Sequence, residues 1–144
     1  MTGLSEVTGS TYAIAVTVHR PFGDTLTATR EALAAQGFGV LTEIDMQATL
    51  QAKLDVDIAP QVILGACRPP LAQAALQAEP SIGMLLPCNV VVRAVDGDRT
   101  LVETIDPDIM VSVTGNPDLQ AVATEARTRL TAALHSLRPS PPTC

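Results

Sequence analysis

The sequence predicts a two-layer α+β sandwich, in which a mostly antiparallel sheet of five to six strands packs against helices on one face. Three observations lead to this prediction. Residues 12–19 alternate between two sets of side chains, which indicates a half-buried strand. Asp96 and Gly97 separate two runs of β-forming residues, a pattern typical of a hairpin. Asn116 then caps a long helix whose apolar residues recur at helical spacing as far as Leu137.

The next elements of the first half are bounded by capping residues. Asp24 is expected to cap the first helix, and Gly37 is expected to end it. A strand over residues 38–44 follows. Asp45 is then expected to cap a short helix over residues 46–54.

The middle of the chain predicts a buried strand followed by a short helix. Residues 62–64 are apolar on both faces, as in a strand that is covered on each side. Pro69 and Pro70 fit the first turn of the helix, where an amide hydrogen would have no partner within the helix. Glu79 and Pro80 are expected to end that helix.

The remaining segments depend on turn chemistry. Residues 81–87 contain glycine and proline and are expected to form a tight apolar loop. A two-residue turn at 96–97 pairs Val90 with Glu103, whereas a three-residue loop shifts every pair by one. Residues 109–113 are expected to form an edge strand. Since several strands carry small or apolar residues on both sides, a second subunit is expected to cover the open face of the sheet.

The composition describes one globular domain with an aliphatic core. The chain has 144 residues, of which 47% are hydrophobic and 17% charged, and this excludes a disordered protein. We expect a single domain over residues 11–138, with flexible ends at 1–10 and 139–144.

The charge balance and the N-terminus exclude several partners. With 15 acidic and 9 basic residues, and Lys53 as the only lysine, the chain has few cations to offer a phosphate backbone, so we expect no nucleic-acid partner. The first ten residues lack the segments of a signal peptide. No apolar run reaches the roughly 18 residues of a membrane span. These features predict a cytoplasmic protein with no membrane partner, whose cysteines are free thiols.

Cys67 is the first candidate catalytic residue. It lies between a predicted strand and a predicted helix, beside Arg68. A neighbouring cation and the N-terminus of a helix both favour thiolate, which would make Cys67 a nucleophile. The alternative is a small buried residue that only packs, because free cysteine is among the most buried residue types.

Cys88 and Glu103 are the other two catalytic candidates. In the two-residue register Glu103 shares an apolar face with Cys88, where an unpaired carboxylate is costly. The alternative is that Glu103 lies at an edge and pairs with Arg99 or with solvent. Cys144, the last residue, is expected to be exposed in a proline-rich tail.

Other chemistry receives little support from the residues. Glu43 ends a predicted strand and is either a functional carboxylate or a solvated one. His19 and His135 have no ligand spacing to each other or to the cysteines, so we expect no metal site. Serine-nucleophile, phosphate-loop and dinucleotide motifs are absent, so no cofactor is expected.

Three segments resemble a known family. They are GFGVLTEIDMQATLQAKL (residues 37–54), ILGACRPPLAQAALQAEPSIGMLLPCNVVV (residues 63–92) and TIDP (residues 104–107). With them the chain resembles domain-of-unknown-function family 302 over nearly all of residues 12–137. The resemblance implies a TATA-box-binding-protein-like α+β fold and a homodimer, and it assigns no reaction. It marks Glu43, Asp45, Gly65, Cys67, Pro69, Pro87, Cys88, Asn89 and Asp106.

The chain departs from the family pattern at three positions. Arg68 stands where the family often has asparagine, and Gln47 and Gln51 stand where charged residues are usual. A polar ligand that charged residues at helix positions 47 and 51 would hold is therefore not expected. The residues expected to bind a ligand are Glu43, Cys67, Arg68, Cys88, Asn89 and Asp106.

The function classes that remain are of three kinds. The preferred hypothesis is a homodimeric module that binds an apolar or sulfur-containing small molecule between residues 81–87 and Cys67, because it requires no reactive thiol. The alternative is a thiol-dependent enzyme or sulfur carrier in which Cys67 is the nucleophile and Cys88 or Glu103 assists. The third is a structural or regulatory dimer whose cysteines only pack.

Overall fold

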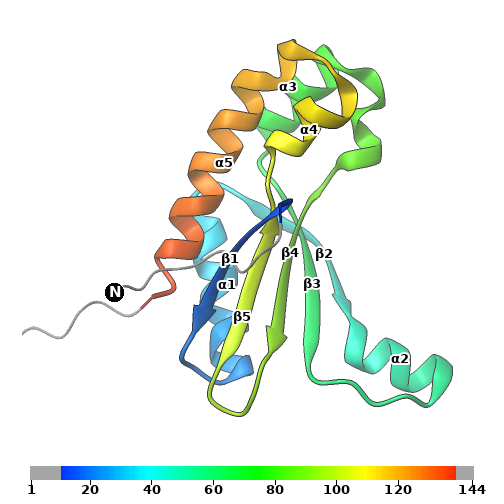
Figure 1. The fold of residues 1–144 in the computed structure, drawn as a ribbon, viewed down its shortest axis with the longest axis vertical. Helices are drawn as coiled ribbons and strands as arrows, with labels where there is room; N and C mark the ends of the chain where they lie inside the picture. The colour runs from blue at the N-terminus through cyan, green and yellow to red at the C-terminus, as the bar shows by residue number, and fades with distance from the viewer. Residues whose placement is uncertain (1–10, 139–144) are drawn as a thin grey trace, which may run out of the picture.

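The computed structural model describes residues 11–138 and contains one antiparallel sheet of five strands in the order β1-β5-β4-β3-β2 (Figure 1). The predicted ends at 1–10 and 139–144, with Cys144, lie outside the described residues. The strands are β1 (Ala13–Val18), β2 (Gly39–Asp45), β3 (Gln61–Cys67), β4 (Cys88–Ala94) and β5 (Thr100–Ile105).

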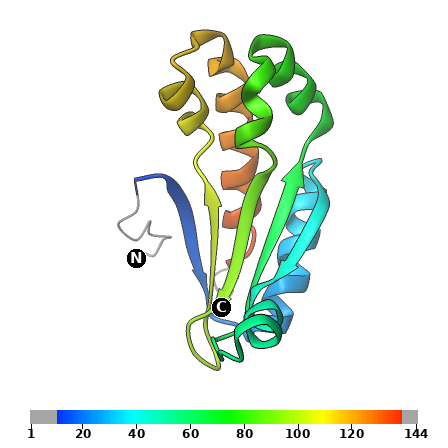
Figure 2. The same cartoon turned by 90° about the vertical axis from the view of Figure 1, so that its right-hand side faces the viewer.

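Helices cover one face of the sheet and one of its ends. Helices α1 and α5 lie behind the strands in Figure 2, whereas α3, η1 and α4 gather at one end and α2 projects at the other. The arrangement confirms the predicted two-layer α+β fold. The helices are α1 (Phe22–Ala35), α2 (Met46–Leu54), α3 (Pro69–Ala78), α4 (Asp108–Thr114) and α5 (Gln120–His135), with 3₁₀ turns at η1 (Pro80–Leu85) and η2 (Pro117–Leu119).

Two apolar clusters stabilise these layers. The larger lies between the sheet and helices α1 and α5, where Leu33, Leu64 and Leu130 are fully buried. The smaller lies at the end of the sheet and joins Ile82 of η1 to Met110 of α4 and their neighbours on α3 and α5. Among residues 11–138, no helix combines the length and apolar character needed to cross a bilayer.

The predicted caps are confirmed at two of three helices. The Ala48 amide donates to Asp45 Oδ1 at 2.9 Å and begins α2. The Asp118 amide donates to Asn116 Oδ1 at 2.9 Å and begins η2, which leads into α5. The predicted cap at Asp24 is wrong: α1 begins at Phe22, and Asp24 lies in its first turn, because Pro21 provides the extended N-cap backbone.

The hairpin adopts the three-residue register, so the two-residue pairing is wrong. Ala94 pairs with Thr100, and Glu103 lies opposite Val91 instead of Val90. The side chain of Asp96 stabilises the longer loop, since its Oδ1 accepts the Asp98 amide at 2.9 Å and its Oδ2 accepts Arg99 Nε at 2.8 Å. These bonds, led by that from the Asp98 amide, hold the pKa of Asp96 below its ordinary value.

Two further segments are helical where the sequence predicts otherwise. Residues 109–113 belong to α4 instead of an edge strand: the Asp108 amide donates to Asp106 Oδ1 at 3.0 Å, and Gly115 ends the helix with a φ of 67°. Met110 of this helix is buried, and such tertiary packing can override the β propensity of residues 109–113. Most of the predicted loop over residues 81–87 is the 3₁₀ turn η1, anchored by its buried residue, Ile82.

Candidate functional site

The open face of the sheet, turned away from α1 and α5, carries small and apolar residues. Cross-strand pairs place Ile63, Val91, Glu103 and Ala15 in one row across it. These side chains point away from the core because their neighbours, such as Val90, are buried against the helices. Small residues at several positions leave part of this face hollow.

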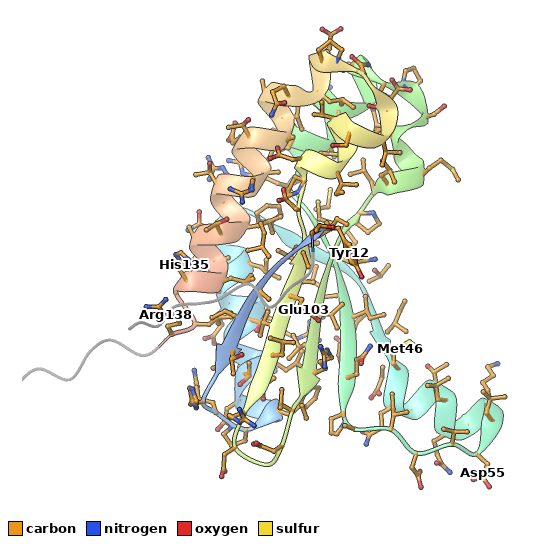
Figure 3. All side chains as sticks on the ribbon, viewed as in Figure 1. Tyr12, Met46, Asp55, Glu103, His135 and Arg138 are labelled. Carbon is orange, nitrogen blue, oxygen red and sulfur yellow. The ribbon has the colours of Figure 1, made fainter. Side chains whose placement is uncertain are left out.

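The hollow part lies below η1, over β1, β4 and β5. Two adjoining cavities of about 220 Å³ and about 270 Å³ share Asn89 and Ile105, and together we call them the Asn89 groove. Figure 3 shows Tyr12 at the start of β1 and Glu103 on β5, which mark one side of it. The groove is lined by Tyr12, Ala13, Met84, Leu85, Leu86, Pro87, Asn89, Val91, Glu103, Thr104 and Ile105.

Asn89 and Glu103 both face this groove, and they differ in their hydrogen-bond partners. The exposed carboxamide of Asn89 makes no hydrogen bond to another described residue, although the Asn89 carbonyl accepts the Thr104 hydroxyl at 3.1 Å. Glu103, whose side chain is 23% exposed, accepts Arg93 Nε on Oε1 at 3.2 Å. The groove therefore offers an unused amide and one partly neutralised carboxylate.

Gly65 fixes one wall of the groove. A Cβ at this position would collide with Thr42 Oγ1 and would lie 2.9 Å from Pro87 Cγ. Only glycine allows both side chains to close over the strand, since real Cβ contacts are longer. Pro87 lines both the Asn89 groove and a second cavity.

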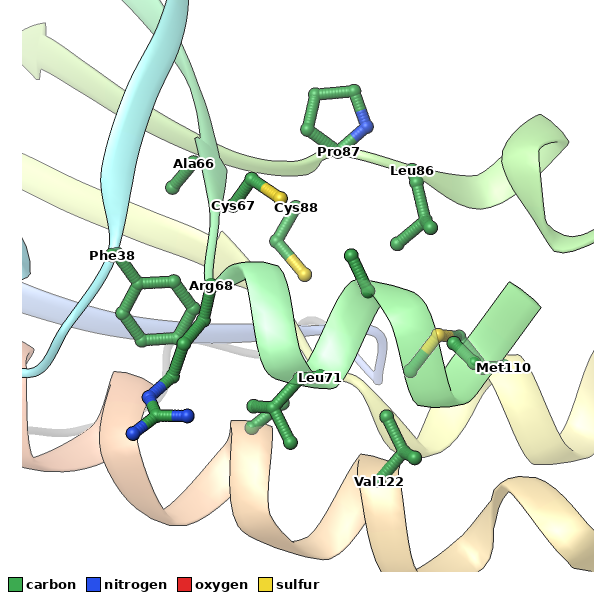
Figure 4. Close-up of a pocket in the computed structure, with 13 residues that line it drawn as sticks. Phe38, Ala66, Cys67, Arg68, Leu71, Leu86, Pro87, Cys88, Met110 and Val122 are labelled. Atoms are coloured by element: carbon green, nitrogen blue, oxygen red, sulfur yellow. The ribbon is translucent and has the colours of Figure 1, made fainter. Parts of the chain in front are cut away.

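The second cavity contains both described cysteines and is small. It has a volume of about 30 Å³ and lies between α3 and the ends of β3 and β4 (Figure 4). Its walls are largely apolar, formed by residues such as Phe38, Leu71 and Met110. The space is that of about one or two water molecules, which is too little for an organic ligand.

Cys88 is a packed thiol. Burial, with a smaller contribution from Cys67, raises the pKa of Cys88 to about 11 from the ordinary 9.0. The thiol is therefore protonated at neutral pH. Neither cysteine forms a disulfide with another described residue.

The raised pKa makes stability depend on pH at the alkaline end. The Cys88 thiol ionises near pH 9 in the unfolded chain and near 11 in the folded one, so its stabilisation is complete below pH 9 and is lost as pH rises to about 11. Between pH 8 and 11 we expect the free energy of unfolding to fall by about 2 kcal/mol more than in a Cys88→Ala variant. Urea unfolding under reducing conditions from pH 8 to 11 measures this difference, and a parallel fall in both proteins would contradict it.

Neither the Arg68 guanidinium nor the N-terminus of α3 is placed to favour a Cys67 thiolate. The Arg68 side chain extends away from both thiols (Figure 4), with Nη1 4.0 Å from Glu125 Oε2 on α5. The first turn of α3 offers no spare amide, because Pro69 and Pro70 have none and the next amide, from Leu71, donates to the Arg68 carbonyl at 3.0 Å. Cys67 is half-buried, and neither of these two features is directed at its thiol.

The remaining predicted residues lie apart from one another. Glu43 forms an ion pair with Arg30 of α1. The Asp106 carboxylate accepts the Asp108 amide at the start of α4 and Arg127 Nε at 3.3 Å, so both partners are within the protein. Glu103 points to the open face and Cys88 to the core, so the predicted neighbourhood of these two side chains is wrong.

The predicted site is thus divided. Cys67, Arg68 and Cys88 surround the small cavity, whereas Asn89 and Glu103 face the groove. Sequence reasoning missed Tyr12 and Met84, which are 61% and 86% exposed beside it. The signal that could have found the groove is the run of small residues on one face of β1. No cluster of metal-binding side chains occurs in the part of the chain that the structure describes.

Comparison with known proteins identifies the family. The model of the family named "Domain of unknown function DUF302" matches residues 14–137. The chain belongs to the DUF302 family. Among solved structures, it is similar to the uncharacterised conserved protein DUF302 from Bacillus stearothermophilus, with 31% identity and a TM-score of 0.82 over 90% of this chain and 100% of that chain. No curated protein matches this DUF302 chain.

Proposed function

We propose that this DUF302 protein is a small-molecule-binding or regulatory module and that the Asn89 groove is its binding site. The groove itself supports the proposal: its two cavities of about 220 Å³ and about 270 Å³ are walled by apolar side chains and contain an unused carboxamide at Asn89. Ligand sites are commonly concave, mostly apolar and supplied with a few polar groups.

We further propose that the module is a homodimer. Exposed apolar side chains form a surface on β2 and α2, outside the residues that line the groove: Leu41 and Leu54 are 65% and 66% exposed, and Ile44 is also exposed. No residue of α2 is buried, and the helix projects from the sheet (Figure 1). Such a patch is typical of a contact between subunits, and a second copy is the commonest partner.

The thiol-dependent alternative receives less support. The cysteine cavity of about 30 Å³ leaves no space for a substrate beside Cys88. Arg68 extends toward α5, and Glu103 lies on the opposite face of the sheet. Arg68 and Glu103 are therefore not placed to activate or assist Cys67, and Cys88, which lies beside it, is a protonated thiol at neutral pH.

Native mass spectrometry of freshly purified protein tests the proposal. We expect the mass of a dimer that carries an additional small molecule. An Ala13→Trp variant should lose that molecule, because Ala13 lines the groove and an indole would fill it. An Ala34→Trp variant should keep it, since Ala34 is exposed on α1, on the other side of the sheet.

Each result bears on a separate part of the proposal. A bare mass for the unmodified protein would contradict tight binding, and a monomer would contradict the homodimer. Retention of the molecule by Ala13→Trp would place the site outside the Asn89 groove. Circular dichroism of both variants checks that the added indole has not disturbed the fold.

A further inference from the structure

The charge inside the Asn89 groove comes from one residue. Among the groove's lining side chains, Glu103 is the one carboxylate, and none is a lysine, arginine or histidine. Arg93 occupies its Oε1 at 3.2 Å, while Oε2 accepts no hydrogen bond from the described residues. Since Glu103 is only 23% exposed, its charge is less screened than that of a surface carboxylate.

The polar groups of the groove favour a ligand that carries a hydrogen-bond donor. Oε2 of Glu103 can only accept a hydrogen bond, and the Asn89 carboxamide can both donate and accept. An N–H group of a ligand would satisfy the carboxylate, whereas an anionic group would meet a like charge. The chain's net charge of −6 acts in the same direction.

The apolar walls favour a flat ligand. Tyr12 presents a phenol ring, and Met84 presents a polarisable thioether. Val91 and Ile105 form an apolar floor on the sheet. Ring faces and thioethers both make favourable contacts with aromatic molecules.

We propose that the Asn89 groove selects a flat aromatic molecule that is neutral or cationic and carries an N–H donor, and that Glu103 rejects anionic analogues. This inference rests on the proposed binding function and adds the chemical class of the ligand. The groove discriminates by charge through one carboxylate whose partner, Arg93, lies on the neighbouring strand.

Two fluorescent probes that differ by one sulfonate test this selection. N-phenyl-1-naphthylamine is neutral and carries an N–H group, and 1-anilinonaphthalene-8-sulfonate is its anionic counterpart. At about 0.15 M salt, interactions between exposed charges more than about 8 Å apart are largely screened, so titrations at this concentration isolate the effect of nearby charges. We expect the neutral probe to bind at least about tenfold more tightly, a difference of about 1.4 kcal/mol.

The decisive measurement is the change in this ratio, because the neutral probe is also the more apolar one. Glu103→Gln should reduce the ratio about tenfold by tightening sulfonate binding, and Arg93→Gln should increase the ratio. Glu31→Gln removes the same charge from the exposed face of α1 and should leave the ratio unchanged. Circular dichroism of each variant confirms that it is folded.

The outcomes separate the two proposals. If neither probe binds, or if Ala13→Trp binds both as well as the unmodified protein, the proposed binding function fails. If Ala13→Trp abolishes binding but Glu103→Gln leaves the ratio unchanged, the groove is a binding site and selection by Glu103 is wrong. An equal effect of Glu31→Gln would show that net charge, instead of the groove, sets the ratio.

Discussion

Replacing Ile82 with alanine is expected to lower the free energy of unfolding by about 2 to 5 kcal/mol. Ile82 is 1% exposed and anchors η1 among Ala75, Met110 and Leu119. Truncation removes buried apolar surface and leaves a cavity that these neighbours cannot fully close. Because η1 also supplies Met84 to the groove, probe binding should weaken as well. Urea unfolding and titration with N-phenyl-1-naphthylamine measure the two effects.

The matched control lies two residues further along the same 3₁₀ turn. Met84 is 86% exposed, so Met84→Ala should change stability by no more than about 0.5 kcal/mol. It removes a groove wall, so probe affinity should still fall. A loss of stability for Ile82→Ala no larger than that of Met84→Ala would show that η1 is not held by the smaller apolar cluster.

The caps of this fold can be predicted from the sequence because each depends on close neighbours. Asp45 and Asn116 each accept an amide two or three residues further along the chain. The long apolar stripe of α5 is equally local, and Leu130 and Leu134 are buried as its spacing requires. Elements of this kind are specified by short-range pattern alone.

The pairing of β4 with β5 depends on a finer balance. Asp96-Gly97 is compatible with a loop of two or three residues, and in the longer loop the Asp96 carboxylate accepts the Asp98 amide while Val90, Val92 and Val102 are buried on the core face. A shift of one residue turns Glu103 from the core face to the open face. The register of this one hairpin therefore decides which cavity a candidate residue faces.

The direction of a long side chain also cannot be predicted from the local sequence pattern. Arg68 follows Cys67 in sequence, yet its guanidinium extends toward Glu125, which lies 57 residues away along the chain. The groove is likewise assembled from β1, η1, β4 and β5, so no single segment contains it. The cysteines attracted attention because they are rare, whereas the hollow face is built from common residues.

Replacing Gly65 with alanine is expected to lower the free energy of unfolding by about 1 to 3 kcal/mol. The new Cβ collides with Thr42 Oγ1 and approaches Pro87 Cγ to 2.9 Å. Thr42 lies on an edge strand and can rotate, whereas Pro87 Cγ can move only through a change of ring pucker or with the backbone. The groove wall should therefore shift, and affinity for N-phenyl-1-naphthylamine should fall along with stability.

Gly39→Ala provides the control, because its Cβ would meet no atom closer than the Cys67 carbonyl at 3.9 Å. We expect that variant to stay within about 0.5 kcal/mol of the unmodified protein. Adding Thr42→Ala to Gly65→Ala should restore part of the stability, since it removes one of the two collisions, and a double-mutant cycle by urea unfolding measures the coupling. If Thr42→Ala restores the stability fully, Pro87 does not resist the change, and probe affinity should recover as well. If stability recovers but probe affinity does not, the groove wall is set by contacts other than those over Gly65.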